Sequence, residues 1–316
     1  MVGLLLAVGL TVADPTGRVA TAGRWAAAHR GVQAAVWTIF FLSGFGLGRR
    51  RLADGVRDVP CILASLFVIF AVSPALASGL ARFVGPWGLQ LGLILVGIMP
   101  TTLSSGVVMT AAAGGNPATA LVVTVVANWL AVLWVPWALE WFLGAGPAAV
   151  DLDKAALAVR IGLLVAVPLA LGMAARRSAG EAAESMAART RWVNPALVVT
   201  VVWMSASRSR EALVGAPAAV VQAAALSVAY HGAVLASLWL LVTLLRFGKG
   251  RREPLLFMGG QKTLPLAVLI QSTLYPEVGQ ALIVCVVHHL VHLVMDGYLV
   301  TRLAGGGRGE GAGGDV

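Results

Sequence analysis

The sequence predicts an all-α membrane protein with ten transmembrane helices, on the basis of its composition, its apolar runs and the charges between them. Apolar residues make up 59% of the 316 residues, whereas acidic and basic residues make up only 12%. Soluble domains have roughly a quarter of charged residues. This composition argues against a soluble enzyme, a nucleic-acid-binding protein and a disordered chain.

Ten apolar runs are each expected to form a helix across the membrane, because about 20 apolar residues in a helix match the hydrocarbon core. Residues 1–13 are short for a span, so either the chain begins upstream or this helix is shallow. A signal peptide fits poorly, because no basic residue precedes them. The glycine-rich residues 305–316 are expected to be a disordered tail. In chain order, the runs are 1–13, 31–48, 59–81, two within 83–139, about 161–175, about 192–207, 212–245, about 254–273 and about 277–303.

The connections between these runs carry unequal positive charge. With the N-terminus counted as connection zero, the even-numbered connections hold about twice as many Lys and Arg residues as the odd-numbered ones. Basic connections remain in the cytoplasm. We therefore expect a multi-pass protein of the cell membrane with both termini in the cytoplasm. Its basic character reflects this topology and its lipid bilayer, and no nucleic-acid partner is expected.

Two of the runs contain helix breakers at their centres. The fourth has Pro100 within 97–106, and the ninth has two glycines and Pro265 within 259–265. Proline removes a backbone donor and glycine weakens a helix. The breaks fall in the fourth helix of each half, about 1–144 and about 152–304, and a duplicated unit of five helices must be inverted in the membrane. Matching broken helices in inverted halves indicate the midplane site of a secondary transporter, and two ordinary proline kinks are the alternative.

The stretch 97–116, with its Met-Pro-Thr-Thr-Leu-Ser-Ser-Gly centre and Gly-Gly-Asn turn, resembles the bile acid:sodium symporter superfamily and its SBF-like branch. Similar residues recur at 40–44, 230–232 and 261–262, so the resemblance covers most of the chain. It implies one transporter unit over 1–304, in which a panel domain and a core domain interleave and helices four and nine cross at their breaks. It also implies alternating-access transport of a small organic anion, with no enzymatic activity.

Polar side chains around the breaks are the candidate substrate- and ion-binding residues. Sodium prefers oxygen ligands, by extension of the preference of calcium and magnesium. The resemblance places Ser104 or Ser105, with Thr124, near the family's first sodium site, and Gln261 at a polar position of the second break. For any single Ser or Thr the alternative is a bond to the preceding turn. The complete candidate set is Thr101, Thr102, Ser104, Ser105, Thr110, Asn116, Thr124, Asn128, His231, Gln261, Lys262 and Thr263.

The sequence departs from the resemblance at the second break. Family members have a glutamate there that serves both sodium sites, but residues 257–262 include no acid, and a helix-three glutamine is missing from the apolar residues 66–70. Lys262 is a costly residue at membrane depth and therefore a functional candidate. Its ammonium could occupy a sodium position, lose a proton to couple transport to protons, pair with an anion, or extend to the interface. Sodium coupling and proton coupling both remain open.

The half-helices that begin after the breaks predict an anionic substrate, because helix N-termini carry partial positive charge. No acidic residue is expected at the midplane, since Glu140 and Asp296 lie towards the ends of their spans. No cofactor is expected, apart from Na+ if it is the coupling ion, and the oligomeric state is not predicted.

Two other functions are open to the sequence. One is a membrane channel or regulatory protein without coupled transport. The other is an intramembrane metal protein, because His288, His292 and Asp296 are spaced by four residues and share a helix face. Against hydrolysis by such a metal, His289 stands where a zinc protease helix has its glutamate base.

Overall fold

The computed structural model is mostly helical over the residues that it describes, which are 2–144, 153–180, 182–190, 192–215 and 217–305. No strand occurs among them. In chain order the helices are α1 (Val2–Ala13), α2 (Arg18–Ala28), α3 (Gly31–Gly46), α4 (Arg49–Gly55), α5 (Val59–Phe67), the π-helical η1 (Val68–Val72), α6 (Ser73–Ala81), α7 (Trp87–Ile98), α8 (Ser105–Ala112), α9 (Pro117–Leu143), α10 (Lys154–Ile161), the π-helical η2 (Gly162–Ala166), α11 (Val167–Ala179), α12 (Ala182–Thr190), α13 (Val193–Arg208), α14 (Arg210–Gly215), α15 (Pro217–Leu244), α16 (Arg252–Gly260), α17 (Leu264–Leu274) and α18 (Gly279–Gly305).

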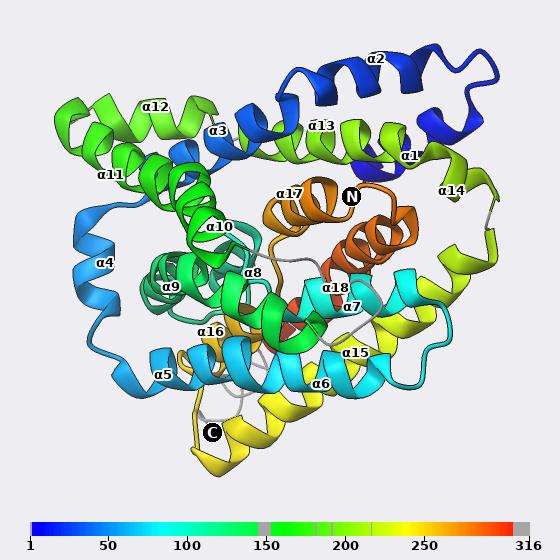
Figure 1. Cartoon of the computed structure of the whole chain (residues 1–316). Coiled ribbons are helices and arrows are strands. Elements are labelled where there is room, and N and C mark those ends of the chain that lie inside the picture. Colours follow the sequence, from blue (N-terminus) through cyan, green and yellow to red (C-terminus); the bar gives the residue numbers. More distant parts are fainter. Residues whose placement is uncertain (1, 145–152, 181, 191, 216, 306–316) are drawn as a thin grey trace.

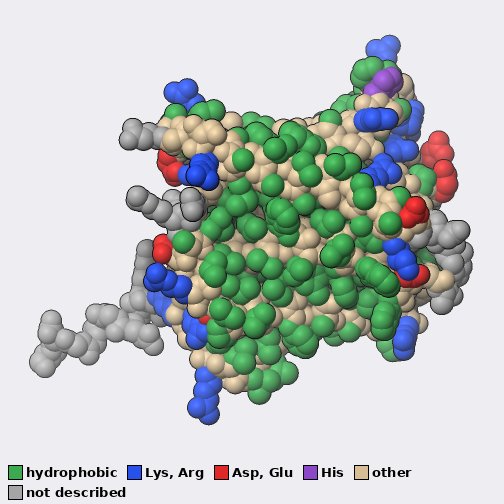
Figure 2. Space-filling view, turned by 60° about the vertical axis from the view of Figure 1, so that its left-hand side comes forward, with side chains coloured by type: hydrophobic (Ala, Val, Ile, Leu, Met, Phe, Trp, Pro, Cys, Tyr) green, Lys and Arg blue, Asp and Glu red, His purple; other side chains and the backbone are tan. Residues whose placement is uncertain are grey.

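Helix length and surface composition both indicate a protein that crosses a membrane several times. Hydrophobic side chains cover the middle of the face seen in Figure 2, while charged side chains gather at its left and right edges. Shorter apolar helices cover 3–13, 31–46 and 87–98. Among the described residues, five continuous helical segments are long and apolar enough to span a membrane: Val59–Ala81, Pro117–Leu143, Lys154–Ala179, Pro217–Leu244 and Gly279–Ala304.

The helices include polar residues that the predicted spans left out. Residues 18–28, expected in a connection, form α2, whose Ala20, Gly23 and Ala27 are buried while its arginines remain at the surface. Apolar runs do not reveal such a helix, because only one face of it is apolar. The expected span 161–175 is likewise part of a helical segment over 154–179. Of the predicted tail, Gly305 ends α18, and 306–316 lie outside the described residues.

The helices pack in two groups (Figure 1). In the first, here called group A, α13 packs against α1, α2 and α3, and α3 packs against α11. In the second, group B, α7 packs against α6 and α18, α15 against α16 and α18, and α16 against α5 and α8. Within group A, Gly44 and Gly172 let backbones touch, since a Cβ atom would lie 2.1 Å from the Leu169 oxygen and 2.0 Å from the Phe41 oxygen respectively.

Both π turns lie two residues before a proline. Pro74 follows η1 and Pro168 follows η2. In η1 the N–H of Ser73 bonds the carbonyl of Val68, one residue earlier than in an α-helix. Pro74 has no N–H, so the carbonyl of Ile69 is left without a donor from its own helix.

Candidate functional site

The backbone leaves the helix at two places that lie against each other. Helix α7 ends at Ile98 and α8 begins at Ser105, whereas α16 ends at Gly260 and α17 begins at Leu264. The residue that follows α7 and the residue that follows α16 adopt the same extended conformation. Met99 has φ −71° and ψ 150°, and Gln261 has φ −75° and ψ 149°. The N–H of Thr263 donates to the carbonyl of Pro100 at 2.9 Å. The two interrupted segments are therefore joined through their main chains.

Five consecutive carbonyl groups, from Gly97 to Thr101, accept hydrogen bonds from other parts of the chain. The last carbonyls of a helix lack partners within that helix, and buried carbonyls must find them elsewhere. In order, their donors are Ser73 Oγ, Trp134 Nε1, Lys262 Nζ, the Thr263 backbone N–H and Asn128 Nδ2, at 3.1, 3.2, 3.0, 2.9 and 3.3 Å. Only one of these donors, Lys262 Nζ, belongs to a basic side chain.

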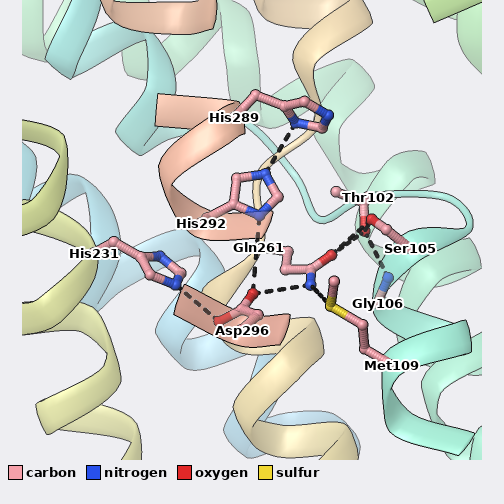
Figure 3. A network of polar contacts seen from close by, with 9 residues as sticks. All are labelled: Thr102, Ser105, Gly106, Met109, His231, Gln261, His289, His292 and Asp296. Atoms are coloured by element: carbon pink, nitrogen blue, oxygen red, sulfur yellow. Dashed lines mark hydrogen bonds and ion pairs between the residues drawn. The ribbon is translucent and has the colours of Figure 1, made fainter. Parts of the chain in front are cut away.

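Gln261 connects the second break to the first break and to α18 (Figure 3). Its Oε1 accepts from the hydroxyls of Thr102 at 2.9 Å and Ser105 at 2.8 Å. Its Nε2 donates to Asp296 Oδ2 at 2.9 Å and to the sulfur of Met109 at 3.0 Å. Since oxygen and nitrogen are both used, the orientation of this amide is fixed by its partners.

Asp296 lies at this site, and the prediction that no acidic residue would do so is wrong. The side chain is fully buried, and its Oδ1 accepts from His231 Nε2 at 2.9 Å. His292 Nδ1 lies 3.8 Å from Oδ2, and His292 Nε2 lies 2.9 Å from His289 Nδ1. Asp296 lies 17 residues beyond the start of α18 and seven before the end of the span that the sequence predicted. Counting along the sequence placed it near a membrane surface, but the packing of α18 against α7 and α15 brings it to Gln261.

The histidines beside Asp296 pack against one another, and the arrangement does not favour the metal alternative. The ring centroids of His288 and His292 are 5.4 Å apart, and that of His288 is also 5.4 Å from Tyr230. His292 Nε2 is already bonded to His289. Within the described part of the chain, no three His, Cys, Asp or Glu side chains are placed to hold a metal ion.

A second polar group lies between the first break and α9. Asn128 Nδ2 donates to the carbonyls of Thr101 and Thr124, the latter at 2.9 Å, which brings the predicted face of α9 against the break. Asn128 Oδ1 and Thr101 Oγ1 are buried and have no hydrogen-bond partner. Buried polar atoms normally have partners, and these two oxygens are among eleven such side-chain atoms without one in the described part of the chain.

Three other candidate side chains form hydrogen bonds with the backbone of their own helices. Asn116 caps α9, its Oδ1 accepting from the N–H groups of Ala118 and Thr119, so it lies at a helix end away from the breaks. Thr110 Oγ1 donates to the carbonyl of Gly106 in its own helix, the alternative weighed for a single threonine. Thr124 Oγ1 similarly donates to the carbonyl of Ala120.

A cavity of about 230 Å³ lies between the breaks and group A. Ser104 and Thr263 line it at the N-termini of α8 and α17, and neither side chain caps its own helix. On the group A side it is lined by Ser43 and Asn194, which are bonded to each other at 3.0 Å. The N-termini of both half-helices therefore face one cavity, and Lys262 is not among its lining residues.

Sequence reasoning missed several residues of the site, among them Ser43 and Asn194 on the wall of the cavity. Asp296 and His289 were noticed only for their spacing on one helix, and Met109 was not noticed at all. The spacing of four residues did indicate that His292 and Asp296 share a face. It could not indicate that this face meets Gln261, because the rotation of α18 is set by its contacts with α7 and α15.

Sequence similarity agrees with the helical architecture. The chain matches the SBF-like CPA transporter family over residues 1–305. It is 31% identical over 314 residues to an Arabidopsis thaliana protein named "Probable sodium/metabolite cotransporter BASS4, chloroplastic", covering 94% of this chain and 70% of that protein. It is 30% identical over 182 residues to a Mus musculus protein named "Sodium/bile acid cotransporter 7", covering 56% and 52%. The predicted family is confirmed, and this chain belongs to the SBF-like CPA transporter family, whose members are transporters and not enzymes.

Proposed function

We propose that the protein is a sodium-coupled secondary transporter of a small organic anion, built from two inverted repeats of five helices. In this proposal α7–α8 and α16–α17 are the fourth helices of the repeats, and they cross at Met99–Ser104 and Gln261–Thr263. The matching conformations of Met99 and Gln261 and the bond from Thr263 to Pro100 support this pairing. Group A corresponds to the panel domain and group B to the core domain.

The main observation in favour of an anionic substrate is that the N-termini of two half-helices, α8 and α17, line the same cavity. Helix N-termini present free N–H groups and partial positive charge, and they are common anion-binding sites. The side chains of Ser104 and Thr263 do not cap these two helices, and the N–H of Gly106 in α8 is bonded to Thr102 Oγ1. The hydroxyl of Ser43 adds a donor on the wall of the cavity. Leu4, Ile39 and Val198 give the cavity an apolar side, which suits an anion with a hydrocarbon body.

The group of Thr101, Thr124 and Asn128 fits a sodium ion. A dehydrated sodium ion needs oxygen ligands (by extension from other hard cations), and the unpartnered Thr101 Oγ1 and Asn128 Oδ1 provide two within a buried region. The hydroxyl of Thr124 donates to its own helix and keeps lone pairs that can face an ion. The names of the relatives agree with sodium as the coupling ion.

Asp296 supplies the negative charge that the second break lacks. The family resemblance predicts an acid within 257–262, where the sequence has none. The carboxylate of α18 instead approaches the break from a neighbouring helix and bonds Gln261. In the proposed transporter it helps to balance the positive charge of cations held at the crossing.

The cavity suggests which side of the membrane the site faces. A second hollow of about 540 Å³ shares Ser104, Ser105 and Asn194 with the first and extends to Leu47 and Pro117. These two residues adjoin even-numbered connections, which the charge bias assigns to the cytoplasm. We therefore assign the structure to an inward-facing state, from which movement of group A against group B would close this opening and expose the site to the other side.

Uptake into proteoliposomes tests the proposal. A bile acid and short carboxylates would be offered under inward sodium, potassium and proton gradients, with organic cations of similar size as controls. We expect saturable anion uptake that depends on the sodium gradient and is lost in Asn128→Ala. Flux without saturation or gradient dependence would favour the channel alternative, and thermal stabilisation by organic cations alone would refute the anionic substrate.

A further inference from the structure

Lys262 is bound in the protein as an inorganic cation would be. The residue is only 2% exposed, and its Nζ donates to the carbonyls of Met99 at 3.0 Å and Ile69 at 3.1 Å. Among the described residues, none of the ion pairs includes Lys262, so its ligands are backbone oxygens and no carboxylate neutralises it. These contacts exclude the interpretations in which it extends to the interface or meets a substrate in the cavity.

The two carbonyls are available because the backbone is irregular at both positions. Ile69 lies in the π turn η1, where the N–H of Ser73 is diverted to Val68 and Pro74 has no N–H to offer. Met99 follows the last residue of α7 in an extended conformation, and Pro100 comes next. Two separate distortions of the backbone thus leave two carbonyls without partners in their own helices, and both accept from Lys262 Nζ.

The electrostatics of this point favour a positive charge. The C-terminus of a helix carries partial negative charge, which stabilises cations there. Carbonyl oxygens alone can replace the hydration shell of an alkali cation, as in potassium channels. The other carbonyls of this helix end receive neutral donors, namely Ser73, Trp134, the Thr263 backbone and Asn128. Only the carbonyl of Met99 receives the amino group of a basic side chain, and the same amino group also bonds the carbonyl of Ile69.

We propose that the ammonium of Lys262 is a tethered cation that occupies a cation site of the transporter and takes the place of one coupling ion. The site is formed by the carbonyls of Ile69 and Met99 and is separate from the proposed sodium site at Thr101 and Asn128. Because the charge is covalently attached, it cannot dissociate during the cycle. The transporter then binds one sodium ion fewer than a carrier in which both positions are filled by free ions. This count rests on the proposed sodium coupling, whereas the cation site itself does not.

Truncation of Lys262 tests the site directly. Lys262→Ala leaves space and two unpaired carbonyls, which we expect a free cation to occupy, whereas Lys262→Met fills the space with apolar atoms and Lys262→Arg retains the charge. Thermal unfolding would be measured for each purified variant in sodium, potassium, methylammonium and the bulky cation choline. We expect sodium or methylammonium to restore most of the thermal stability lost in Lys262→Ala, with little effect on Lys262→Met and Lys262→Arg.

Radiolabelled sodium binding gives the second measurement. We expect Lys262→Ala to bind one sodium ion more per protein than the parent chain, and Lys262→Met to bind no more than the parent. If Lys262→Ala cannot be purified, the yield of folded protein from membranes solubilised with each cation replaces the unfolding assay. Equal destabilisation of Lys262→Ala in all cations, or no rescue of its yield by any of them, would overturn the inference.

The result also separates this inference from the proposed function. Rescue of Lys262→Ala by methylammonium in a parent protein that binds no sodium would support the tethered cation while contradicting sodium coupling. Sodium-dependent uptake by a parent protein whose Lys262→Ala variant shows no rescue would support the function and contradict the tethered cation.

Discussion

Replacing Asp296 by asparagine removes one buried negative charge without changing the size of the side chain. In the protein, the two carboxylate oxygens accept from His231 Nε2 and Gln261 Nε2, each at 2.9 Å. An asparagine has only one oxygen, so its amide group would meet one of these donors. If Gln261 turned its amide to avoid this, it would withdraw its oxygen from the hydroxyls of Thr102 and Ser105. The substitution therefore disturbs both breaks.

The size of the effect follows from the bonds that change. A hydrogen bond to a charged group contributes about 1.5–3 kcal/mol and a neutral one about 0.5–1.5 kcal/mol. Converting two such bonds reduces the free energy of unfolding by roughly 2–3 kcal/mol. Because a change of about 1.4 kcal/mol is a tenfold change in an equilibrium constant, a comparable loss in the sodium-bound state would weaken sodium binding by at least about tenfold.

The measurement is sodium-dependent thermal stabilisation of the purified protein, followed by uptake in proteoliposomes. Glu140→Gln is the matched control, because it also removes one negative charge but from a carboxylate that is half exposed and pairs with Lys154. We expect the control to bind sodium like the parent. If Asp296→Asn retained the parent's stability and sodium affinity, the assigned role of the α18 carboxylate would be refuted.

Two further substitutions test the fold and the limits of the site. Gly172→Ala should destabilise the packing of α11 on α3 by about 1–3 kcal/mol, because a Cβ there would lie 2.0 Å from the Phe41 oxygen. A thermal midpoint equal to that of the parent would contradict this close contact. Asn116→Ala should cost about 1 kcal/mol through loss of a helix cap, seen as a lower thermal midpoint. The sodium affinity of this variant should equal that of the parent. A weaker affinity would show that Asn116 contributes to sodium binding.

The sequence alone predicted a helical membrane protein and two stretches in which helices are interrupted. Its sparse charges and apolar runs require a membrane environment, since only helices or closed barrels satisfy their backbone in lipid. Pro100 and the residues 259–265 interrupt the helices where proline and glycine are expected to do so, within 97–106 and 259–265. Local chemistry suffices for these features, because a missing N–H acts on the turn in which it occurs.

Only the tertiary structure decided which polar groups meet. Asn116 and Asp296 are equally polar in the sequence, yet the first caps a helix and the second bonds Gln261. The interpretations of Lys262 stayed open because its ligands are backbone carbonyls at Ile69 and Met99, and a free carbonyl has no residue type to mark it. Spacing along a helix identifies a face, but packing sets the rotation and depth that determine what that face contacts.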